Sequence, residues 1–490
     1  MDVKKPNILW LCTDQQRHDT LGCYNNKFVR TPNLDRLAEN GVKFSRAYCQ
    51  APVCAPSRAS FLTSRYPRTC RVRQNGQNIH EDEVMVTRVL KNAGYIGGLC
   101  GKLHLSACAP AFCKTEERRI DDGYDYFAWS HDNSPSYDWL CNSYSRWLDS
   151  QGVKNETTPR EDCRHVLNGM PREYSQAKWC ADRTIEFIED ARKADKPWFF
   201  SFNCFDPHHP FDPPNEYLDR YLPILDDIPL PKYVKGELET KPYSQTKEHR
   251  AAYGIKGHFP YDEMTEYDHK LVRAAYYALC DLVDDEIGRI IDYLDQTGEL
   301  ENTIIVFHSD HGESLGDHGI YLKGCYFYDQ SIHVPLIMSW KGKWASGKEV
   351  NALVELIDIA PTLLDACGID KPQGMQGRSF LSLLSPDNEN DHFRDDVFCE
   401  YYKTKITGEV VAFASMIFDG RYKLSMVHEY ISSYPQDIMG ELYDLKNDPD
   451  EVNNLYYAPS HQDIKALLLE KFCNRQALTA DALPYKSAPW

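Results

Sequence analysis

The chain has 490 residues, and its 55 Lys and Arg residues against 73 Asp and Glu residues give a formal net charge of −18. The length fits about three ordinary domains, or one large α/β domain with a smaller companion, and 42% hydrophobic with 12% aromatic residues exclude a disordered chain. Because an acidic surface repels phosphate backbones and no Lys/Arg-rich run is present, we expect no nucleic-acid partner, and an anionic substrate needs positive charge gathered inside a pocket.

The 17 cysteines have an odd count and no regular spacing, and many lie in apolar runs, where buried free thiols are common. The sequence therefore predicts a protein of a reducing compartment, and we expect a cytoplasmic location. The N-terminal apolar run from Asn7 to Cys12 is too short and wrongly flanked for a signal peptide, although a removed leader would leave the same sequence. No apolar run approaches the roughly 18 residues of a membrane helix, so no membrane partner is expected.

Four continuous apolar runs are predicted to be strands buried on both faces of a sheet. They span Ile8–Thr13, Tyr95–Cys100, Trp198–Asn203 and Thr303–His308. Helical patterns alternate with them, at 34–40, 84–92 and from about 268 to 294. Ligands of open α/β sheets bind beyond the carboxyl ends of the strands, so the polar residues that follow these runs are candidates for one common site.

The remaining segments predict a substrate-binding surface and a second, smaller domain. Stretches 105–180 and 210–262 are rich in Pro, Tyr, Asp and Ser with weak periodicity, which is typical of segments that shape or cover a cleft and select a substrate. Beyond a loop-like boundary near 375–395, strands are predicted at 397–402, 410–418, 421–425 and 441–444, and a closing helix at about 460–475. The expected domains are residues 1–380, an α/β catalytic domain, and 381–490, an α+β domain.

The densest chemical pattern is Cys54-Ala55-Pro56-Ser57-Arg58, followed by Leu62-Thr63-Ser64-Arg65. A helix is predicted to begin around Pro56, so Cys54 lies at its N-terminus, where backbone N–H groups and the dipole favour negative charge. Arg58 is expected to reach the same place. On this pattern alone, a buried thiol beside a surface cation is the commoner arrangement.

The longer string resembles the hallmark of the sulfatase family, the formylglycine-dependent members of the alkaline-phosphatase-like superfamily, which reads C-x-P-S-R, a short helix and Thr-Gly/Ser-Arg. The resemblance implies a large mixed sheet sandwiched by helices, with a smaller C-terminal domain made of an antiparallel sheet and a helix. It also implies that a maturase oxidises Cys54 to formylglycine, whose hydrated aldehyde is the nucleophile. The family's other motifs follow in order across most of the chain.

Two residue pairs resemble the family's metal ligands, which act together with Cys54. Asp14 and Gln15 fit the first pair, and Asp310 and His311 fit the second. Either Asp by itself is more often a helix cap or a turn former. Because two carboxylates, an amide and an imidazole make a mostly oxygen site, one divalent metal is expected, with calcium preferred and magnesium or manganese left open.

Three further motif residues have catalytic roles by resemblance. Gly101-Lys102-Leu103-His104 resembles the family's G-K-x-H element, and Lys323 corresponds to its sulfate-neutralising lysine. The resemblance implies that Lys102 and Lys323 neutralise the sulfate and that His104 is the base for its release. Residues two apart on an extended segment point to the same side, so Lys102 and His104 are expected to face the site together.

The segment Asp206-Pro207-His208-His209-Pro210-Phe211 resembles the family's P-H-x-P-F element. His208 is therefore expected to contact the sulfate and to protonate the leaving oxygen, and His209 falls at the variable position. The metal pairs and this element look most like sulfatases of sulfated sugars, including uronate 2-O-sulfatases. A small sulfated saccharide derived from a glycosaminoglycan or mucin is the expected substrate.

Several alternatives to a sulfatase remain. A phosphonate monoester hydrolase or phosphodiesterase of the same superfamily shares the formylglycine and metal, but that branch tends to replace the lysine and histidine of G-K-x-H, so Lys102 and His104 favour a sulfatase. A two-metal phosphatase would use Ser or Thr in place of Cys54, and an inactive relative predicts gaps among the motif positions, of which none is found. The signatures of cysteine hydrolases are absent, and Cys100, Cys108 and Cys113 lack the C-x2-C spacing of a zinc site.

Overall fold

The computed structural model describes residues 5–108, 113, 115–132, 142–429, 440–481 and 483. Its largest element is an eight-stranded sheet in the order β12-β2-β11-β9-β1-β8-β4-β5. The strands are β1 (Asn7–Thr13), β2 (Val42–Phe44), β4 (Ile96–Gly101), β5 (Tyr126–Trp129), β8 (Trp198–Asn203), β9 (Thr303–Ser309), β11 (Leu336–Trp340) and β12 (Lys348–Val350). The five strands from β9 to β5 are parallel, whereas β11 is antiparallel to both β9 and β2. The sheet is therefore mixed, with a parallel centre.

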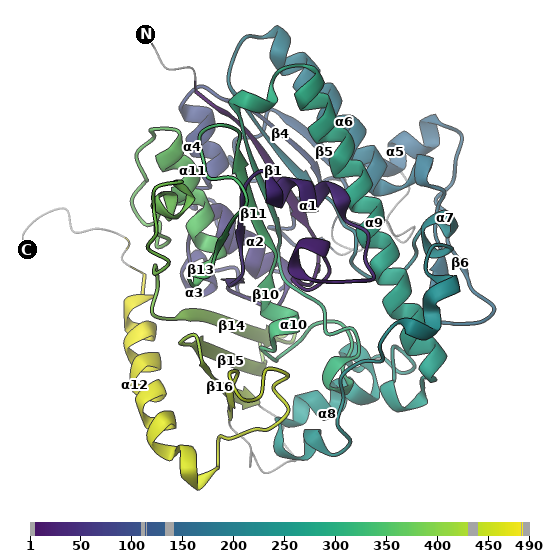
Figure 1. The fold of residues 1–490 in the computed structure, drawn as a ribbon, viewed down its shortest axis with the longest axis vertical. Helices are drawn as coiled ribbons and strands as arrows, with labels where there is room; N and C mark the ends of the chain where they lie inside the picture. The colour runs from purple at the N-terminus through teal and green to yellow at the C-terminus, as the bar shows by residue number, and fades with distance from the viewer. Residues whose placement is uncertain are drawn as a thin grey trace, which may run out of the picture.

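Helices cover both faces of this sheet (Figure 1). One layer contains α1 (Pro32–Glu39), α6 (Gln176–Lys193) and α9 (Glu266–Gln296), and the other contains α2 (Cys54–Thr63), α4 (Val86–Asn92) and α11 (Ile359–Ala366). Residues of β1 alternate between the two layers, since Trp10 packs in the core with α2 and α4 while Leu9 and Leu11 pack in the core with α6 and α9. Both faces are apolar, which is why the strand is a continuous hydrophobic run in the sequence.

A second, antiparallel sheet follows in the order β14-β15-β16-β17. Its strands and the closing helix are β14 (Val397–Thr404), β15 (Val410–Phe418), β16 (Tyr422–Glu429), β17 (Gly440–Asp444) and α12 (Gln462–Leu478). Phe398 and Leu424 pack with Leu468 of α12, whereas Val397 and Met416 belong to the core beneath the large sheet. This smaller sheet is sandwiched between α12 and the main body, as Figure 1 shows at the lower edge of the molecule.

The remaining short elements connect these layers. They are β3 (Ala47–Tyr48), β10 (His333–Val334) and β13 (Val354–Glu355), which form a small sheet, the pair β6 (Thr158–Pro159) and β7 (Leu167–Asn168), and the helices α3 (Pro67–Cys70), α5 (Ser143–Ser150), α7 (Asn215–Leu218), α8 (Tyr243–Arg250) and α10 (Asp329–Ile332). The segments predicted to be irregular thus contain short helices and the start of α6. Their weak periodicity reflects elements too short to show a repeat.

The predicted fold class is confirmed: a large mixed sheet sandwiched by helices, with a separate antiparallel sheet and a closing helix. Predicted and observed elements agree within a few residues. The differences lie at the ends of helices and strands, which depend on capping contacts that periodicity does not report. The boundary between residues 380 and 381 stays a prediction. The short helical turn Leu381–Leu384 still packs, through Leu383 and Leu384, into the core of the main body.

The segment after β4 lies between two residues with left-handed backbone. Gly101 has φ +101°, and an added Cβ atom would lie 2.0 Å from the Asn203 carbonyl oxygen, so only glycine fits there. His104 also has a positive φ, of +57°. The expectation that Lys102 and His104 face the site together through strand alternation stays a prediction.

No disulfide joins the cysteines in the described residues, and among these cysteines only Cys23 and Cys473 are not buried. Cys141 lies outside the described residues. The expected absence of a disulfide framework therefore holds for the part of the chain that the structure describes. Within that same part, no helix combines the length and apolarity needed to cross a membrane.

Candidate active site

The site forms where β1 and β9 end side by side. These strands are parallel with Thr13 opposite Ser309, so the next residues, Asp14 with Gln15 and Asp310 with His311, lie together at the carboxyl edge of the sheet. The Gln15 backbone N–H donates to Asp310 Oδ1 at 3.0 Å, which joins the two turns. The sheet register therefore brings together pairs that are about 300 residues apart in sequence.

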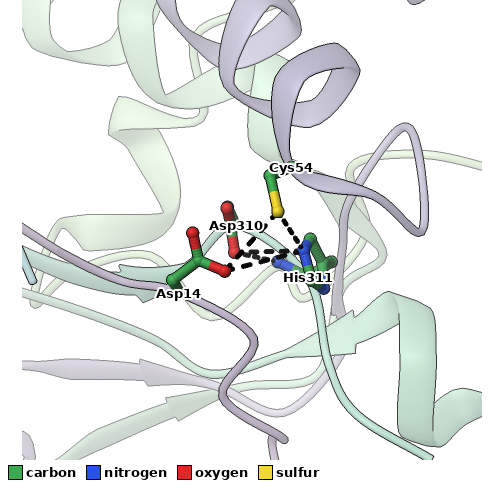
Figure 2. A group of neighbouring side chains, drawn as sticks. All are labelled: Asp14, Cys54, Asp310 and His311. Atoms are coloured by element: carbon green, nitrogen blue, oxygen red, sulfur yellow. Dashed lines mark hydrogen bonds and ion pairs between the residues drawn. The ribbon is translucent and has the colours of Figure 1, made fainter. Parts of the chain in front are cut away.

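Cys54 completes this cluster from the N-terminus of α2. Its Sγ lies 3.1 Å from His311 Nε2 and 3.5 Å from Asp14 Oδ1. One ligand atom from each of Asp14, Cys54, Asp310 and His311 lies within 4.8 Å of every other, and all four residues are buried. Figure 2 shows the four side chains converging, Cys54 from the helix end and the others from the loops that follow the strands. The helix begins at Cys54 itself, two residues before the predicted start.

Arg58 binds the carboxylates of this cluster from the same helix, as predicted from its position one turn after Cys54. Its guanidinium donates to Asp310 Oδ2 at 2.8 Å and to Asp14 Oδ2 at 3.1 Å, and a third bond reaches the Lys102 carbonyl oxygen. The side chain is completely buried. A planar fork of donors can hold two carboxylates in fixed positions, which a lysine cannot do.

Two lysines flank the Cys54 sulfur. Lys102 Nζ lies 3.6 Å from Sγ and 2.7 Å from Asp14 Oδ2. Lys323 Nζ lies 2.9 Å from Sγ and also contacts Gln15 Oε1 at 2.7 Å and His208 Nε2 at 2.9 Å. Both side chains are buried. The positive charge that an anionic substrate requires is thus concentrated around one atom.

These neighbours control protonation at the centre. Burial and Asp14 favour the protonated thiol, but Lys102, Lys323 and His311 outweigh them and lower the pKa of Cys54 to about 6. Burial also favours the neutral form of Asp14, yet Lys102 and Arg58 hold the pKa of its carboxyl well below the usual range. The Cys54 thiol and the Asp14 carboxyl are therefore ionised at neutral pH.

Backbone contacts fix which nitrogen of each histidine faces the centre. His311 Nδ1 contacts the Gly312 carbonyl oxygen at 2.8 Å, and His208 Nδ1 contacts the His209 carbonyl oxygen. A carbonyl can only accept, so each Nδ1 carries a proton. The Nε2 of His311 faces Cys54 and Lys323, and the Nε2 of His208 faces Lys323. Burial and Lys323 hold the pKa of His208 well below the usual range, which makes its ring neutral here.

Glu313 orients Gln15, a role that the sequence analysis missed. Its carboxylate accepts a hydrogen bond from Gln15 Nε2 and from the backbone N–H groups of Leu315, at 2.8 Å, and Leu322. Since the Gln15 amide nitrogen is occupied, its Oε1 faces Lys323 and the cluster. The position of Glu313 three residues after Asp310 is the only sequence signal for this contact.

His104 lies beside the site in a way that spacing did not predict. Its ring packs against His131 with centroids 4.4 Å apart, and among the described residues its buried Nδ1 has no hydrogen-bond partner. Glu117 holds the turn, since its carboxylate accepts the backbone N–H groups of His104 at 2.8 Å, Leu105, and Ser106 at 2.8 Å. Neither Glu117 nor His131 belongs to a motif, so the sequence gives no sign of either contact.

The donor set fits a divalent metal. Two carboxylates and the Nε2 of His311 face one point, together with the side chain of residue 54. The Oε1 of Gln15 lies beside them, 2.7 Å from Lys323 Nζ. The second contacts of His311 and Gln15 fix their orientation, as is usual for metal ligands. Oxygen atoms predominate, which favours calcium, magnesium or manganese over a thiolate-bound transition metal.

All ten residues predicted for the site lie in this region, although no described hydrogen bond joins the His104 ring to Cys54.

Comparison with protein-family models matches residues 6–369 to "Sulfatase" and residues 316–477 to "N-sulphoglucosamine sulphohydrolase, C-terminal". The chain is 29% identical to an arylsulfatase of Clostridium perfringens over 96% of this chain and 95% of that protein. It is 26% identical to iduronate 2-sulfatase of Homo sapiens, over 94% of this chain and 93% of that protein.

Among solved structures, the phosphonate monoester hydrolase of Silicibacter pomeroyi superposes with a TM-score of 0.81 at 26% identity, covering 97% of this chain and 96% of that chain. The range matched to the first family model, residues 6–369, includes all of the site residues.

Proposed function

Since the chain belongs to the sulfatase family and is a sulfuric ester hydrolase, we propose that it hydrolyses sulfate monoesters of small saccharides with a formylglycine made from Cys54 and one divalent metal. The observation that carries this proposal is the position of the Cys54 side chain. It lies at a helix N-terminus, within 3.6 Å of two lysines and beside two carboxylates and an imidazole. The two lysines offer positive charge to the oxygens of an anionic ester held there.

Formylglycine supplies a hydrated aldehyde as nucleophile, and the metal supplies the positive charge that favours its ionised form. Asp14, Gln15, Asp310 and His311 would hold the metal. Calcium is our proposed ion, because oxygen donors predominate. Arg58 keeps both carboxylates in place through its bonds to Asp14 and Asp310.

The lysines bind the sulfate group. Lys102 and Lys323 approach the side chain of residue 54 from separate elements, so each can donate to a different sulfate oxygen as charge develops there. Burial depresses the pKa of His208 most, and Lys323 adds to this effect more than any other charged group. A bound sulfate pairs with Lys323, weakens its repulsion of His208 and allows Nε2 to carry a proton.

His208 is then placed to protonate the leaving oxygen from Nε2, and it is the most solvent-exposed of these side chains, with 12% exposure. This exposure locates the leaving group on the outer side of the sulfate. His104, with its Nδ1 available, remains our candidate for the base that takes a proton when sulfate is released.

A saccharide is proposed as the leaving group on the basis of the relatives. The human iduronate 2-sulfatase matches over almost the whole chain, and the predicted motifs look most like sugar sulfatases. The second candidate is phosphonate monoester hydrolysis, which the close superposition on the Silicibacter pomeroyi enzyme favours. The presence of Lys102 and His104 favours hydrolysis of a sulfate ester over hydrolysis of a phosphonate monoester.

The test is mass spectrometry of the Cys54 peptide from protein co-produced with a formylglycine maturase, with parallel assays on 4-nitrophenyl sulfate, monosaccharide sulfates and a phosphonate monoester. We expect the aldehyde form of residue 54 and sulfatase activity that Cys54→Ala lowers by about a thousandfold or more. Cys367→Ala, which changes another buried thiol at the end of α11, is the matched control. Full sulfatase activity of Cys54→Ala, or faster phosphonate than sulfate hydrolysis, contradicts the proposal.

Removal of the metal is the second arm of this test. Dialysis against a chelator should abolish turnover, and calcium should restore it more fully than magnesium or manganese. The protein should also unfold at a lower temperature without the ion, because the metal then no longer offsets the repulsion between the carboxylates of Asp14 and Asp310. Unchanged activity and unchanged unfolding after complete metal removal would refute the metal site.

A further inference from the structure

An aromatic cluster lies directly beside His208 and has no part in the chemistry described above. It consists of His209, Tyr253 and His258, and each is only partly buried. The His209 ring stacks on His208 with centroids 4.1 Å apart. His209 also lies 5.8 Å from Tyr253 and 6.1 Å from His258, and the last two rings are 6.1 Å apart. The cluster therefore continues the surface on which the leaving group must lie.

The loop that carries Tyr253 is held rigidly. Tyr253 has φ +58°, and the backbone N–H of this residue donates to Glu248 at 2.6 Å. The loop is closed by a backbone bond from Ala252 to the His258 carbonyl oxygen at 2.8 Å. Phe259 anchors its base in the core, where its ring lies 5.6 Å from Phe211. A left-handed tyrosine costs conformational energy, and such strain is concentrated at functional sites.

The Tyr253 ring contacts the His209 ring, which in turn stacks on His208. Burial raises the pKa of the Tyr253 phenol, so its hydroxyl remains a hydrogen-bond donor at neutral pH. By contrast, Ile255 at the tip of the loop is 56% exposed. One residue of the loop thus belongs to the cluster beside His208, while another faces solvent.

The geometry of the three rings selects one class of ligand. Centroid separations near 6 Å are contact distances, so a quaternary ammonium group cannot fit between the rings as it does in an aromatic cage. The carboxylate of Glu248 is engaged by the backbone N–H of Tyr253. The cluster offers an apolar surface with a phenol and imidazoles, which suits a ring that has an apolar C–H face and also carries hydroxyl groups.

We propose that Tyr253, together with His209 and His258, binds the pyranose ring that carries the sulfate ester and so makes the site specific for saccharides. This assignment rests on the proposed sulfatase function and adds the residues that recognise the leaving group. The C–H face of the sugar packs on the rings, and a sugar hydroxyl accepts from the Tyr253 phenol. A 4-nitrophenyl leaving group has no such hydroxyl and depends less on this residue.

The experiment compares maturase-treated wild type, Tyr253→Leu and Tyr253→Phe on monosaccharide sulfates esterified at O2, O3, O4 or O6, and on 4-nitrophenyl sulfate. We expect Tyr253→Leu to lower kcat/KM for the preferred monosaccharide sulfate by about 30-fold or more. The same variant should change turnover of 4-nitrophenyl sulfate by less than about threefold, and inhibition by inorganic sulfate should not change, because the sulfate contacts are made by other residues. Tyr253→Phe, which keeps the ring, should lose about fivefold on the saccharide.

Ile255→Ala is the control for general disturbance of the loop and should behave as wild type. Equal losses on both substrate types, or no loss in Tyr253→Leu, overturn the assignment. If Tyr253→Leu does not fold, a Tyr253→Phe variant with unaltered saccharide kinetics overturns it as well. A wild type that hydrolyses 4-nitrophenyl sulfate but no monosaccharide sulfate refutes the saccharide assignment alone, whereas a wild type inactive on every sulfate ester refutes the proposed function.

Discussion

Glu117 is the clearest case of a single residue whose role depends on the folded chain. Its carboxylate accepts hydrogen bonds from three consecutive backbone N–H groups, of residues 104 to 106, and from Trp129 Nε1 at 3.0 Å. Those contacts hold His104 at its positive φ and fix the turn that begins at Lys102. Glu117 touches neither Cys54 nor the ligand pairs in any described contact, so it acts as a positioning residue.

Replacement of Glu117 by Gln should therefore lower turnover rather than substrate binding. The amide can accept at only one atom and directs an NH2 group at backbone donors, which leaves buried N–H groups unpaired at a cost of about 1–3 kcal/mol each. We expect kcat to fall by about tenfold or more and KM to change by less than about threefold in steady-state assays.

Asp284→Asn is the matched control for this variant. Asp284 also accepts two backbone N–H groups, from Asn33 at 3.1 Å and Leu34 at 2.8 Å, but it lies in α9 against α1. It should lose stability to a similar extent without losing kcat. If both variants lose stability and neither loses kcat, Glu117 has only a structural role.

At the scale of elements, the alternation of strand residues explains how the small sheet joins two cores. Phe398 on β14 packs under α12, while its neighbour Val397 enters the core of the main body. Period-two alternation puts consecutive residues on opposite faces, so this sheet is apolar on both faces. The C-terminal strands are therefore stabilised by the main body on one face and by α12 on the other.

The contribution of α12 can be measured with two adjacent leucines. Leu468 is 1% exposed and packs against the small sheet, whereas Leu467 is 51% exposed. Leu468→Ala should lower the free energy of unfolding by about 2–5 kcal/mol in urea denaturation, because it leaves a cavity, and Leu467→Ala by less than about 0.5 kcal/mol. Equal effects of the two substitutions would show that α12 does not stabilise the sheet by apolar packing.

Elements differ in how well the sequence predicts them. The runs that became β1, β8 and β9 are buried on both faces, so their hydrophobic signal is continuous and independent of partners. The left-handed backbone of His104 was not predicted, since it depends on Glu117, which lies 13 residues further along the chain. A pattern of local residues cannot report a contact that forms only when another segment packs against it.

For the whole molecule, the pH dependence of stability should report a buried carboxyl group. Asp206 is 3% exposed, and among the described residues its Oδ1 has no hydrogen-bond partner. Burial raises the pKa of Asp206 from 3.8 to about 7. The folded protein therefore retains a proton that the unfolded chain releases at lower pH.

This group stabilises the fold fully below pH 4, and its contribution is lost progressively as the pH rises to about 7, by up to about 4 kcal/mol. We expect the free energy of unfolding of Asp206→Asn to equal that of the wild type near pH 4 and to exceed it at pH 8. The measurement is the free energy of unfolding of both proteins across this pH range. Parallel pH profiles for the two proteins would show that the carboxyl group is ionised in the folded state throughout.

The charge of the molecule is also distributed in a way that composition cannot show. The chain as a whole carries a formal charge of −18, yet Arg58, Lys102 and Lys323 are buried around Cys54. An acidic exterior with a cationic interior favours a small anion that fits the site over a large polyanion that must remain at the surface. This distribution is consistent with the small sulfated saccharide that we propose.

The sequence by itself determined the fold class, the family resemblance and the identity of the residues around Cys54, because each depends on local pattern or on motifs whose spacing is preserved along the chain. Only the tertiary structure decided how those residues meet. The register of β1 with β9 joins Asp14 to Asp310, Glu117 sets the turn at His104, and Tyr253 reaches His209 from a separate loop. These contacts connect distant segments, and their geometry is set by packing, which no local pattern records.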